Sequence, residues 1–258
     1  MNDGRLRIAI GATVVLLGLP FLAACESSQD KNARLKAQGT GLEAEKAVSV
    51  GRENPDVKVA EKTSITDENG TAVIVRLDSS SSRDQVDLPI IFELTDASGE
   101  PVGDNAVPGI QRTLTHATVV PARKESWWVN DQVVAAGEAS TVKVQVGTST
   151  TPVPKEILDF KPTEPVLRND PIDGIVASGK VTNPTGQEQR KVLITIVGTR
   201  GRKVVAAGRG VVAKLKPNKA ARYSVFFIGN PKGANLEISA TPTLFEGVPE
   251  GGEDLAAP

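Results

Sequence analysis

Short apolar runs recur along residues 49–149, and polar turns separate them. In residues 141–146 the valines fall on one face and Lys143 and Gln145 on the other, because side chains alternate along a strand. Asn69-Gly70 is the strongest short signal for a hairpin. About seven runs at roughly 8–12-residue spacing are typical of an immunoglobulin-like β-sandwich. The expected strands cover residues 57–59, 72–77, 88–95, 100–102, 111–120, 126–129 and 141–146.

A second set of runs follows a proline-rich segment. Four prolines within residues 152–165 stiffen the chain and forbid a long helix, so they place a domain boundary near residue 152. The later runs cover residues 173–182, 191–197, 203–206, 210–215, 221–228 and 234–244. The pattern predicts an all-β protein with two tandem immunoglobulin-like β-sandwiches, over residues 49–151 and 171–245, joined by a linker over residues 152–170. Cutting that linker is expected to yield two separately folded domains.

The first 24 residues have a different pattern. Arg5 and Arg7 precede an apolar run over residues 8–21, and Ala23-Ala24 supplies small residues at its end. This order of charge, apolar run and small residues predicts a secretory signal peptide over residues 1–24. The alternative is an uncleaved anchor, but residues 8–24 are near the lower length limit for a membrane-spanning helix.

Leu22-Ala23-Ala24-Cys25 resembles the bacterial lipobox, the motif that lipoprotein signal peptidases recognise. The resemblance implies cleavage before Cys25 and a diacylglycerol on its sulfur, with palmitate-type acylation of the new amino terminus. Two or more acyl chains anchor a protein stably to a membrane. Residues 25–48 contain few large apolar residues and are expected to form a flexible tether. Residues 246–258 are rich in Gly, Glu and Pro and are expected to be disordered.

Residues 172–245 carry a second resemblance. Gly179-Lys-Val-Thr-Asn-Pro-Thr, a β run, and Leu215-Lys-Pro-Asn-Lys before a Ser-Val-Phe-Phe strand are similar to the FxLYD-type domain of prokaryotic envelope proteins. The resemblance implies a small Ig-like sandwich, common in lipoproteins, and no catalytic residues. The chain departs from the pattern at residues 197–199 and at Asn218, where the family has glycine. Asparagine tolerates the left-handed conformation that such a glycine provides.

Composition narrows the function classes. The chain has 30 basic and 31 acidic residues, and without residues 1–24 the formal charge is −2. This balance disfavours binding to nucleic acid, which needs a basic excess. Cys25 is the only cysteine, so the folded part has no disulfide and depends on burial for its stability.

Few residues suggest catalytic or metal chemistry. His116 is the only histidine, no Gly-x-Ser-x-Gly elbow is present, and His116 is expected on a strand face. One histidine and one cysteine are too few for a zinc site, and no cofactor is expected. Oxygen ligands for Ca²⁺ exist at residues 67–69 and around Asp84 and Asp87, although carboxylates in solvated turns are far commoner.

Two groups of residues are candidate surface contacts. Trp127 and Trp128 are neighbours in an expected strand and so point to opposite faces. One is therefore expected in the core, while the other either packs under a loop or contacts a sugar, a lipid or a partner. A basic cluster faces anionic lipid or wall polymer, or is simply a solvated sheet face. Its members are Arg200, Arg202, Lys203 and Arg209.

The sequence therefore predicts an extracytoplasmic, lipid-anchored envelope protein without catalytic activity. Its two modules would contact another envelope protein or a wall polymer. One alternative is a hydrolase that uses carboxylates, although aromatic residues that stack on sugars are only 3% of the chain. Another is a solute-binding lipoprotein, which needs two α/β lobes that the pattern does not show. A deep pocket lined by paired acids would favour the hydrolase.

Overall fold

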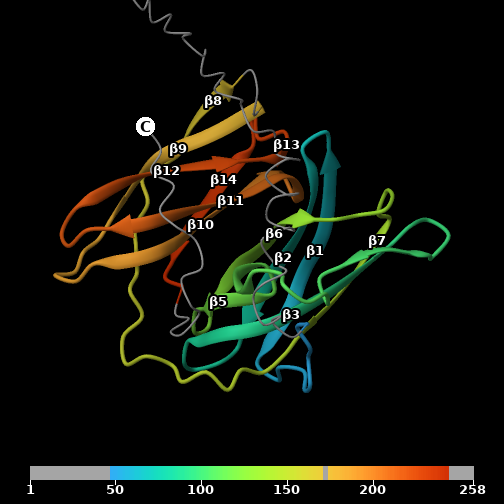
Figure 1. Ribbon diagram of the computed structural model, residues 1–258, viewed down its shortest axis with the longest axis horizontal. Helices are drawn as coiled ribbons and strands as arrows, with labels where there is room; N and C mark the ends of the chain where they lie inside the picture. The colour runs from blue at the N-terminus through green and yellow to red at the C-terminus, as the bar shows by residue number, and fades with distance from the viewer. Residues whose placement is uncertain (1–46, 171–173, 244–258) are drawn as a thin grey trace, which may run out of the picture. The chain divides into compact units, whose positions relative to one another are not determined.

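The computed structural model describes residues 47–170 and 174–243, which form antiparallel β-sheets and one short 3-10 turn (Figure 1). The all-β prediction is confirmed. The first sandwich consists of β1 (Val57–Asp67), β2 (Gly70–Ser79), β3 (Gln85–Thr95), β4 (Pro101–Asp104), η2 (Arg112–Leu114), β5 (His116–Val120), β6 (Glu125–Val133) and β7 (Thr141–Val146). The second sandwich consists of β8 (Val166–Asp170), β9 (Gly174–Thr182), β10 (Gln189–Arg200), β11 (Lys203–Leu215), β12 (Ala220–Phe226), β13 (Ile228–Gly229) and β14 (Asn235–Thr241).

In the first sandwich, the sheet β1-β2-β6 packs against a second sheet. The second sheet consists of β3 and the strands that pair with it, which are β4, β5 and β7. The predicted hairpin at Asn69-Gly70 joins β1 to β2, where Asp67 pairs with Gly70. Alternate side chains from both sheets fill the core between them, as the alternating pattern requires. The largest buried members of this core are Leu77, Leu88, Ile90, Phe92, Leu94 and Trp128.

The second sandwich packs the sheet β13-β11-β10-β14 against the sheet β12-β9-β8. Ile194, Ile196, Leu215, Tyr223 and Phe227 are buried between them. Asn218 lies in the turn between β11 and β12 with φ of 52°, the left-handed conformation expected for this asparagine.

A third apolar core joins the two sandwiches. It contains Ala72, Ile74 and Val129 from the first sandwich and Val197, Val204, Ala207 and Ile228 from the second. Sheets β1-β2-β6 and β13-β11-β10-β14 are therefore covered on both faces, and four sheets lie in successive layers. The described residues 47–170 and 174–243 accordingly belong to one compact unit.

The segment predicted as a linker takes part in the second sandwich. Phe160 is 3% exposed in its core, and the Tyr223 hydroxyl donates a hydrogen bond to the Thr163 carbonyl at 2.8 Å. Strand β8 also lies within the predicted linker and pairs with β9. The boundary near residue 152 stays a prediction, but the residues after it are held by packing and hydrogen bonds.

One expected strand differs from the structure. Residues 111–120 were expected to alternate throughout, yet η2 occupies Arg112–Leu114 and β5 begins only at His116. The turn brings the Leu114 carbonyl to the buried side chains of Asn105 and Asn130, which both donate to it. Buried amide groups that need an acceptor thus account for the break in the strand.

Several predictions fall outside the described residues. These are the signal peptide over residues 1–24, the lipobox with Cys25, nearly all of the tether over residues 25–48 and the tail over residues 246–258. Within the described ranges, no helix has the length and apolar character needed to cross a membrane.

Candidate functional site

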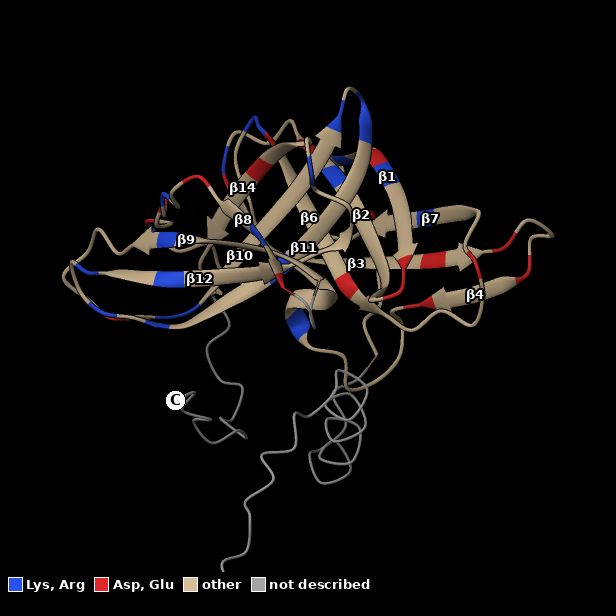
Figure 2. Cartoon of the chain, turned by 90° about the horizontal axis from the view of Figure 1, so that it is seen from above, with Lys and Arg blue, Asp and Glu red and all other residues tan. Residues whose placement is uncertain are grey.

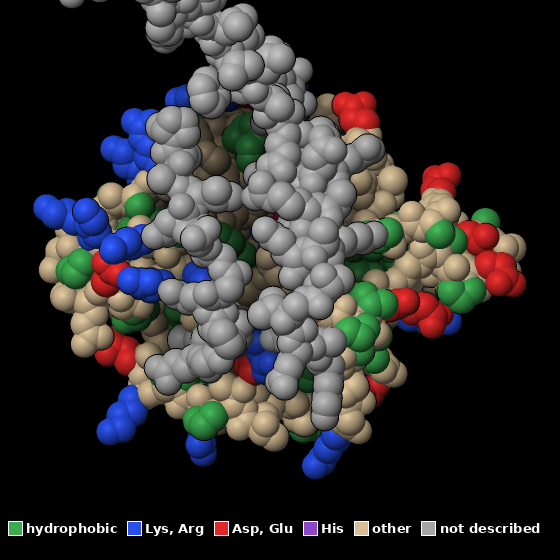
Figure 3. Space-filling view, in the orientation of Figure 1, with side chains coloured by type: hydrophobic (Ala, Val, Ile, Leu, Met, Phe, Trp, Pro, Cys, Tyr) green, Lys and Arg blue, Asp and Glu red, His purple; other side chains and the backbone are tan. Residues whose placement is uncertain are grey.

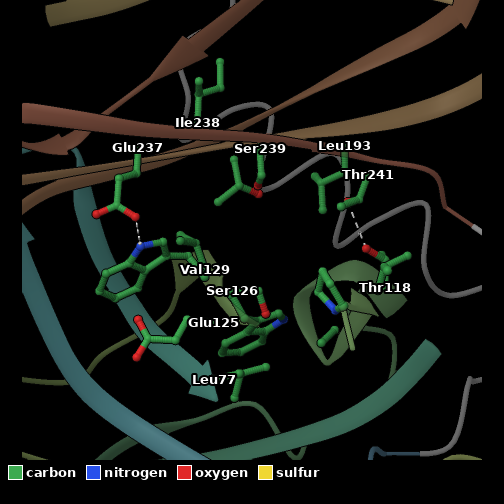
Figure 4. Close-up of a pocket in the computed structure, with 16 residues that line it drawn as sticks. Leu77, Thr118, Glu125, Ser126, Val129, Leu193, Glu237, Ile238, Ser239 and Thr241 are labelled. Atoms are coloured by element: carbon green, nitrogen blue, oxygen red, sulfur yellow. Dashed lines mark hydrogen bonds between the residues drawn. The ribbon is translucent and has the colours of Figure 1, made fainter. Parts of the chain in front are cut away.

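A cleft of about 250 Å³ lies at one edge of the third core, between the first and second sandwiches (Figure 4). Strands β5 and β6 line one side, and β10 and β14 line the other. Apolar, hydroxyl and carboxylate groups all contribute to the lining. The residues are Leu77, Ala117, Thr118, Val119, Pro121, Glu125, Ser126, Trp127, Trp128, Val129, Leu193, Thr195, Glu237, Ile238, Ser239 and Thr241.

Trp127 is the half-buried aromatic residue of this cleft. The β2–β6 register places it directly opposite Arg76, whose guanidinium carbon lies 5.6 Å from the ring centroid. At that distance the cation is attracted to the ring face. The indole N–H donates a hydrogen bond to Glu237 Oε2 at 2.9 Å, across the two sandwiches. Trp127 is thus held at both its ring and its nitrogen.

The two carboxylates of the cleft already have partners. Glu125 accepts from Arg76 Nη1 at 3.2 Å, and Glu237 accepts from the Trp127 indole. Across the cleft, the hydroxyls of Thr118 and Thr241 lie 3.0 Å apart (Figure 4). An aromatic ring with hydroxyl and carboxylate acceptors suits a ligand with both apolar and hydrogen-bonding groups, such as a polyol or a peptide.

Trp128 is the member of the tryptophan pair that lies in the core, as expected for one of the two, so only Trp127 remains a candidate surface contact. It is 5% exposed, and its ring centroid lies 6.3 Å from that of Phe92. Its indole N–H donates to the His116 carbonyl at 3.2 Å. Alternation along β6 explains the outcome, because Trp127 and Trp128 point to opposite faces and only one face meets the first core.

Arg209 is also buried, so it does not belong to an exposed basic cluster. Its side chain is 5% exposed and lies 3.8 Å from the Asp131 carboxylate of the first sandwich. Its Nη1 donates to the carbonyls of Thr113 at 2.9 Å and Val129 at 3.2 Å. Asp131 in turn accepts the Arg209 backbone N–H at 2.9 Å. This group lies beside the third core and ties β11 to β6.

Burial governs the titration of this ion pair. Removal from water raises the pKa of the Asp131 carboxyl, and the Arg209 charge offsets part of that rise. Burial likewise lowers the pKa of the Arg209 guanidinium, which Asp131 counteracts. Arg209 stays protonated, since guanidinium pKa values start far above neutrality. At 3.8 Å from each other, and with side chains 5% and 15% exposed, the two groups form a buried ion pair between the sandwiches.

The other three basic residues of the predicted cluster are exposed around the β10–β11 turn. Arg200 donates from Nη2 to the carbonyls of Asn230 at 3.1 Å and Lys232 at 2.6 Å. Arg202 is exposed in the turn itself, and Lys203 is exposed at the start of β11. The structure keeps these three together and separates them from Arg209.

His116 lies beside a buried acidic residue. Asp87, 3% exposed and at φ of 57°, receives two hydrogen bonds from Arg112, at 2.8 and 2.5 Å, and one from the Thr151 hydroxyl. The Nδ1 atom of His116 is 2.9 Å from the Thr115 hydroxyl. Burial and the nearby Arg112 charge lower the pKa of His116 to about 4, although Asp87 acts in the opposite direction.

This low pKa predicts a loss of stability in acid. Unfolded His116 binds a proton below its ordinary pKa of about 6.5, whereas the folded residue does so only near 4. The free energy of unfolding should therefore fall between these pH values, by on the order of 1–3 kcal/mol from this residue, because the ring is partly solvated. Urea titrations at pH 7.0 and 4.5 measure the fall. His116→Gln should reduce it, and an equal fall in the variant would contradict the assignment.

The acidic groups considered for Ca²⁺ have internal partners. Asp67 accepts from the backbone N–H groups of Asn69 at 2.8 Å and Gly229 at 2.7 Å. Asp84 accepts from the Ala122 N–H at 2.7 Å. Within residues 47–170 and 174–243, no three His, Cys, Asp or Glu residues come together as a set that could hold a metal ion.

Comparison of the sequence with protein-family models and with curated proteins gave no match. The resemblances to lipoproteins and to the FxLYD-type domain therefore stay predictions.

The sequence did not single out Glu125, Asp131 or Glu237, which connect or line the space between the sandwiches. A signal for this interface was present in two runs without polar alternation, residues 72–75 and residues 192–198, of which only Thr195 is polar. A strand with only one face in a core alternates, whereas a strand buried on both faces does not.

Proposed function

We propose that this protein is a lipid-anchored, extracytoplasmic envelope protein that acts as a non-catalytic binding module. Cys25 carries the lipid, and the following residues connect it to the sandwiches. The cleft at Trp127 is the contact for an envelope protein or a wall polymer. The observation that carries this proposal is the half-buried Trp127 in a cleft whose two walls come from different sandwiches.

The shared core supports the binding role because it fixes the two walls of the cleft. Apolar packing, the Arg209–Asp131 pair and the Trp127–Glu237 hydrogen bond all join the same two sheets. A ligand that binds a preformed cleft loses less free energy to ordering of the protein. The cleft therefore favours recognition that depends on both sandwiches together.

Carboxylates on both walls are the one feature that favours the alternative, a hydrolase. Glu125 belongs to the first sandwich and Glu237 to the second, and both line the cleft. Each is engaged by a hydrogen-bond donor, whereas a general acid or base must reach its substrate. Binding is therefore the better supported proposal.

Cys25→Ala tests the anchor. The variant should lose all labelling by a fatty-acid probe, because the thioether requires the cysteine sulfur. It should also no longer partition with lipidated proteins into the detergent phase. Labelling in growing cells followed by detergent phase separation provides the measurement. Cys25→Ser serves as a second variant, and continued labelling of either one would sink the anchor proposal.

Photo-crosslinking in intact cells tests the cleft. A benzoylphenylalanine at Ser239, which lines the cleft, should capture an envelope protein or wall material. The same group at Ser98, in the exposed turn between β3 and β4, is the matched control. Trp127→Ala should reduce capture at Ser239 at least about tenfold, as expected for loss of a central aromatic contact. Equal capture at both positions would contradict a role for the cleft.

A further inference from the structure

The net charge of the chain is near zero, but the two sandwiches carry net charges of opposite sign. Residues 47–151 contain nine basic and fifteen acidic residues, a formal charge of −6. Residues 174–243 contain twelve basic residues and only Glu188 and Glu237 as acidic ones, a formal charge of +10. Figure 2 shows Lys and Arg on β9 and β12, and Asp and Glu on and beside β3 and β4; Figure 3 shows the same separation of charge between the two ends of the molecule. The second sandwich is thus suited to an anionic partner.

The sheet β12-β9-β8 is the outermost layer of the second sandwich. Its inner face packs in the core through Ala177, Val181, Tyr223 and Val225. Register places the alternate residues together on the outer face, in rows that run across the strands. The rows are Arg222–Lys180, Ser224–Ser178–Val166 and Phe226–Val176–Arg168. We call these eight residues the outer face.

The outer face combines exposed basic and apolar side chains. Lys180, Arg222 and Arg168 are exposed, and Asp170 at the end of β8 is the only carboxylate in the three strands. Phe226 is 48% exposed and Val166 is 59% exposed. In the part of the chain that the structure describes, neither Lys180 nor Arg222 has a carboxylate within ion-pair distance.

Lys180 and Arg222 are directly opposite each other on neighbouring strands. Like charges in this position destabilise a sheet, so the fold gains nothing from the pair. An anionic partner would relieve the repulsion. Phe226 is exposed in the same face, which indicates that the partner also has an apolar region next to its charged groups. A bilayer with anionic headgroups has both features.

We propose that the outer face docks on an anionic membrane surface, with the three basic residues against headgroups and Phe226 in the interfacial region. The proposal rests on the proposed lipid anchor only for its effect in the cell. If the 21 residues between Cys25 and Ala47 behave as a flexible chain, they hold the sandwich roughly 25 Å from the bilayer. Tethering at that distance gives a weak contact a high effective concentration.

Vesicle sedimentation tests the docking separately from the anchor. A chain that begins at Glu26 lacks Cys25 but keeps all three cores, which lie between Val57 and Ala240. It should bind vesicles that contain phosphatidylglycerol, release them in high salt, and not bind pure phosphatidylcholine. This chain has no lipid anchor, so absence of vesicle binding would not bear on the lipidation of Cys25. In the same way, absence of lipid labelling at Cys25 would not bear on vesicle binding.

Lys180→Glu separates loss of binding from loss of fold. The substitution creates an opposite-charge pair with Arg222, so thermal stability should hold or rise while vesicle binding falls at least about tenfold. Lys203→Glu, at the start of β11, makes the same charge change and should reduce binding less than about threefold. Phe226→Ser should weaken binding several-fold, with Val134→Ser as an exposed control on the first sandwich.

Three results would overturn the proposal. The first is no binding to anionic vesicles at low salt. The second is an equal loss in Lys180→Glu and Lys203→Glu, which would indicate attraction by net charge alone. The third is equally tight binding to soluble polyphosphate with no effect of Phe226→Ser, which would identify an anionic polymer as the partner.

Discussion

Asp131→Ala should destabilise the protein by about 3–5 kcal/mol, because it leaves the buried Arg209 guanidinium without its counter-charge. The remaining partners of Arg209 are the neutral oxygens of Thr113 and Val129. These oxygens accept from Nη1 and Nη2 only, so the Nε–H stays without a hydrogen-bond partner and the charge stays uncompensated. Urea unfolding followed by circular dichroism gives the change in free energy of unfolding.

A double-mutant cycle separates the pair from the cost of a buried charge. Arg209→Met with Asp131→Ala removes both charges, so the double variant should be more stable than Asp131→Ala alone. Lys143→Ala and Glu93→Ala form the control pair, since their side chains are 66% and 47% exposed. That exposed pair should change stability by about 0–1 kcal/mol. A change of similar size for Asp131→Ala would mean that the interface is solvated.

Gly208→Ala should cost about 3 kcal/mol or more. A β-carbon added at Gly208 in β11 would lie 1.9 Å from the Phe226 carbonyl oxygen of β12. Gly210 meets the Ser224 carbonyl oxygen in the same way, at 2.3 Å. The clashing atom belongs to the backbone and not to a flexible side chain, so the whole of β12 must shift. The expected loss of stability is therefore larger than the usual cost of overpacking a core.

Gly186→Ala is the matched control for Gly208→Ala. Nothing lies within 4 Å of its would-be β-carbon, and the residue is exposed in the turn before β10. Thermal unfolding should show a change within about 1 kcal/mol for this variant. If Gly208→Ala were equally mild, the close approach of β11 and β12 would not hold.

Alternation along the chain predicted most of the strands, because each strand with one solvated face shows it. Thr141–Val146 is the clearest case, and the Asn69-Gly70 turn follows from the conformation that a two-residue hairpin requires. The strand ends were less predictable. Residues 203–206 and 210–215 were expected as two strands, but β11 is continuous because Gly208 and Gly210 accommodate the close approach of β12.

The contact between the sandwiches could not be located from local pattern. Residues 72–75 and 192–198 indicate burial on both faces, but not which strands cover them. The pairing of Asp131 with Arg209 joins residues 78 positions apart. Neither residue differs in its local sequence from an ordinary solvated charge, so only the fold assigns their roles. The same holds for Glu237, which faces Trp127 from the other sandwich.

The interface gives the proposed anchor a mechanical consequence. Two sandwiches on a free linker would sample many orientations above a membrane, whereas a joined pair presents the cleft and the outer face in one fixed relation. Binding at the cleft and docking of the outer face would then influence each other through orientation. The shared core is therefore central to both proposals.

Calorimetry tests this shared core most directly. The chain that begins at Glu26 should unfold in one transition, with a calorimetric enthalpy equal to the van't Hoff enthalpy, because all three cores then melt together. Asp131→Ala should lower the temperature of that single transition without splitting it. Two resolved transitions in the unmodified chain, one for each sandwich, would contradict the account.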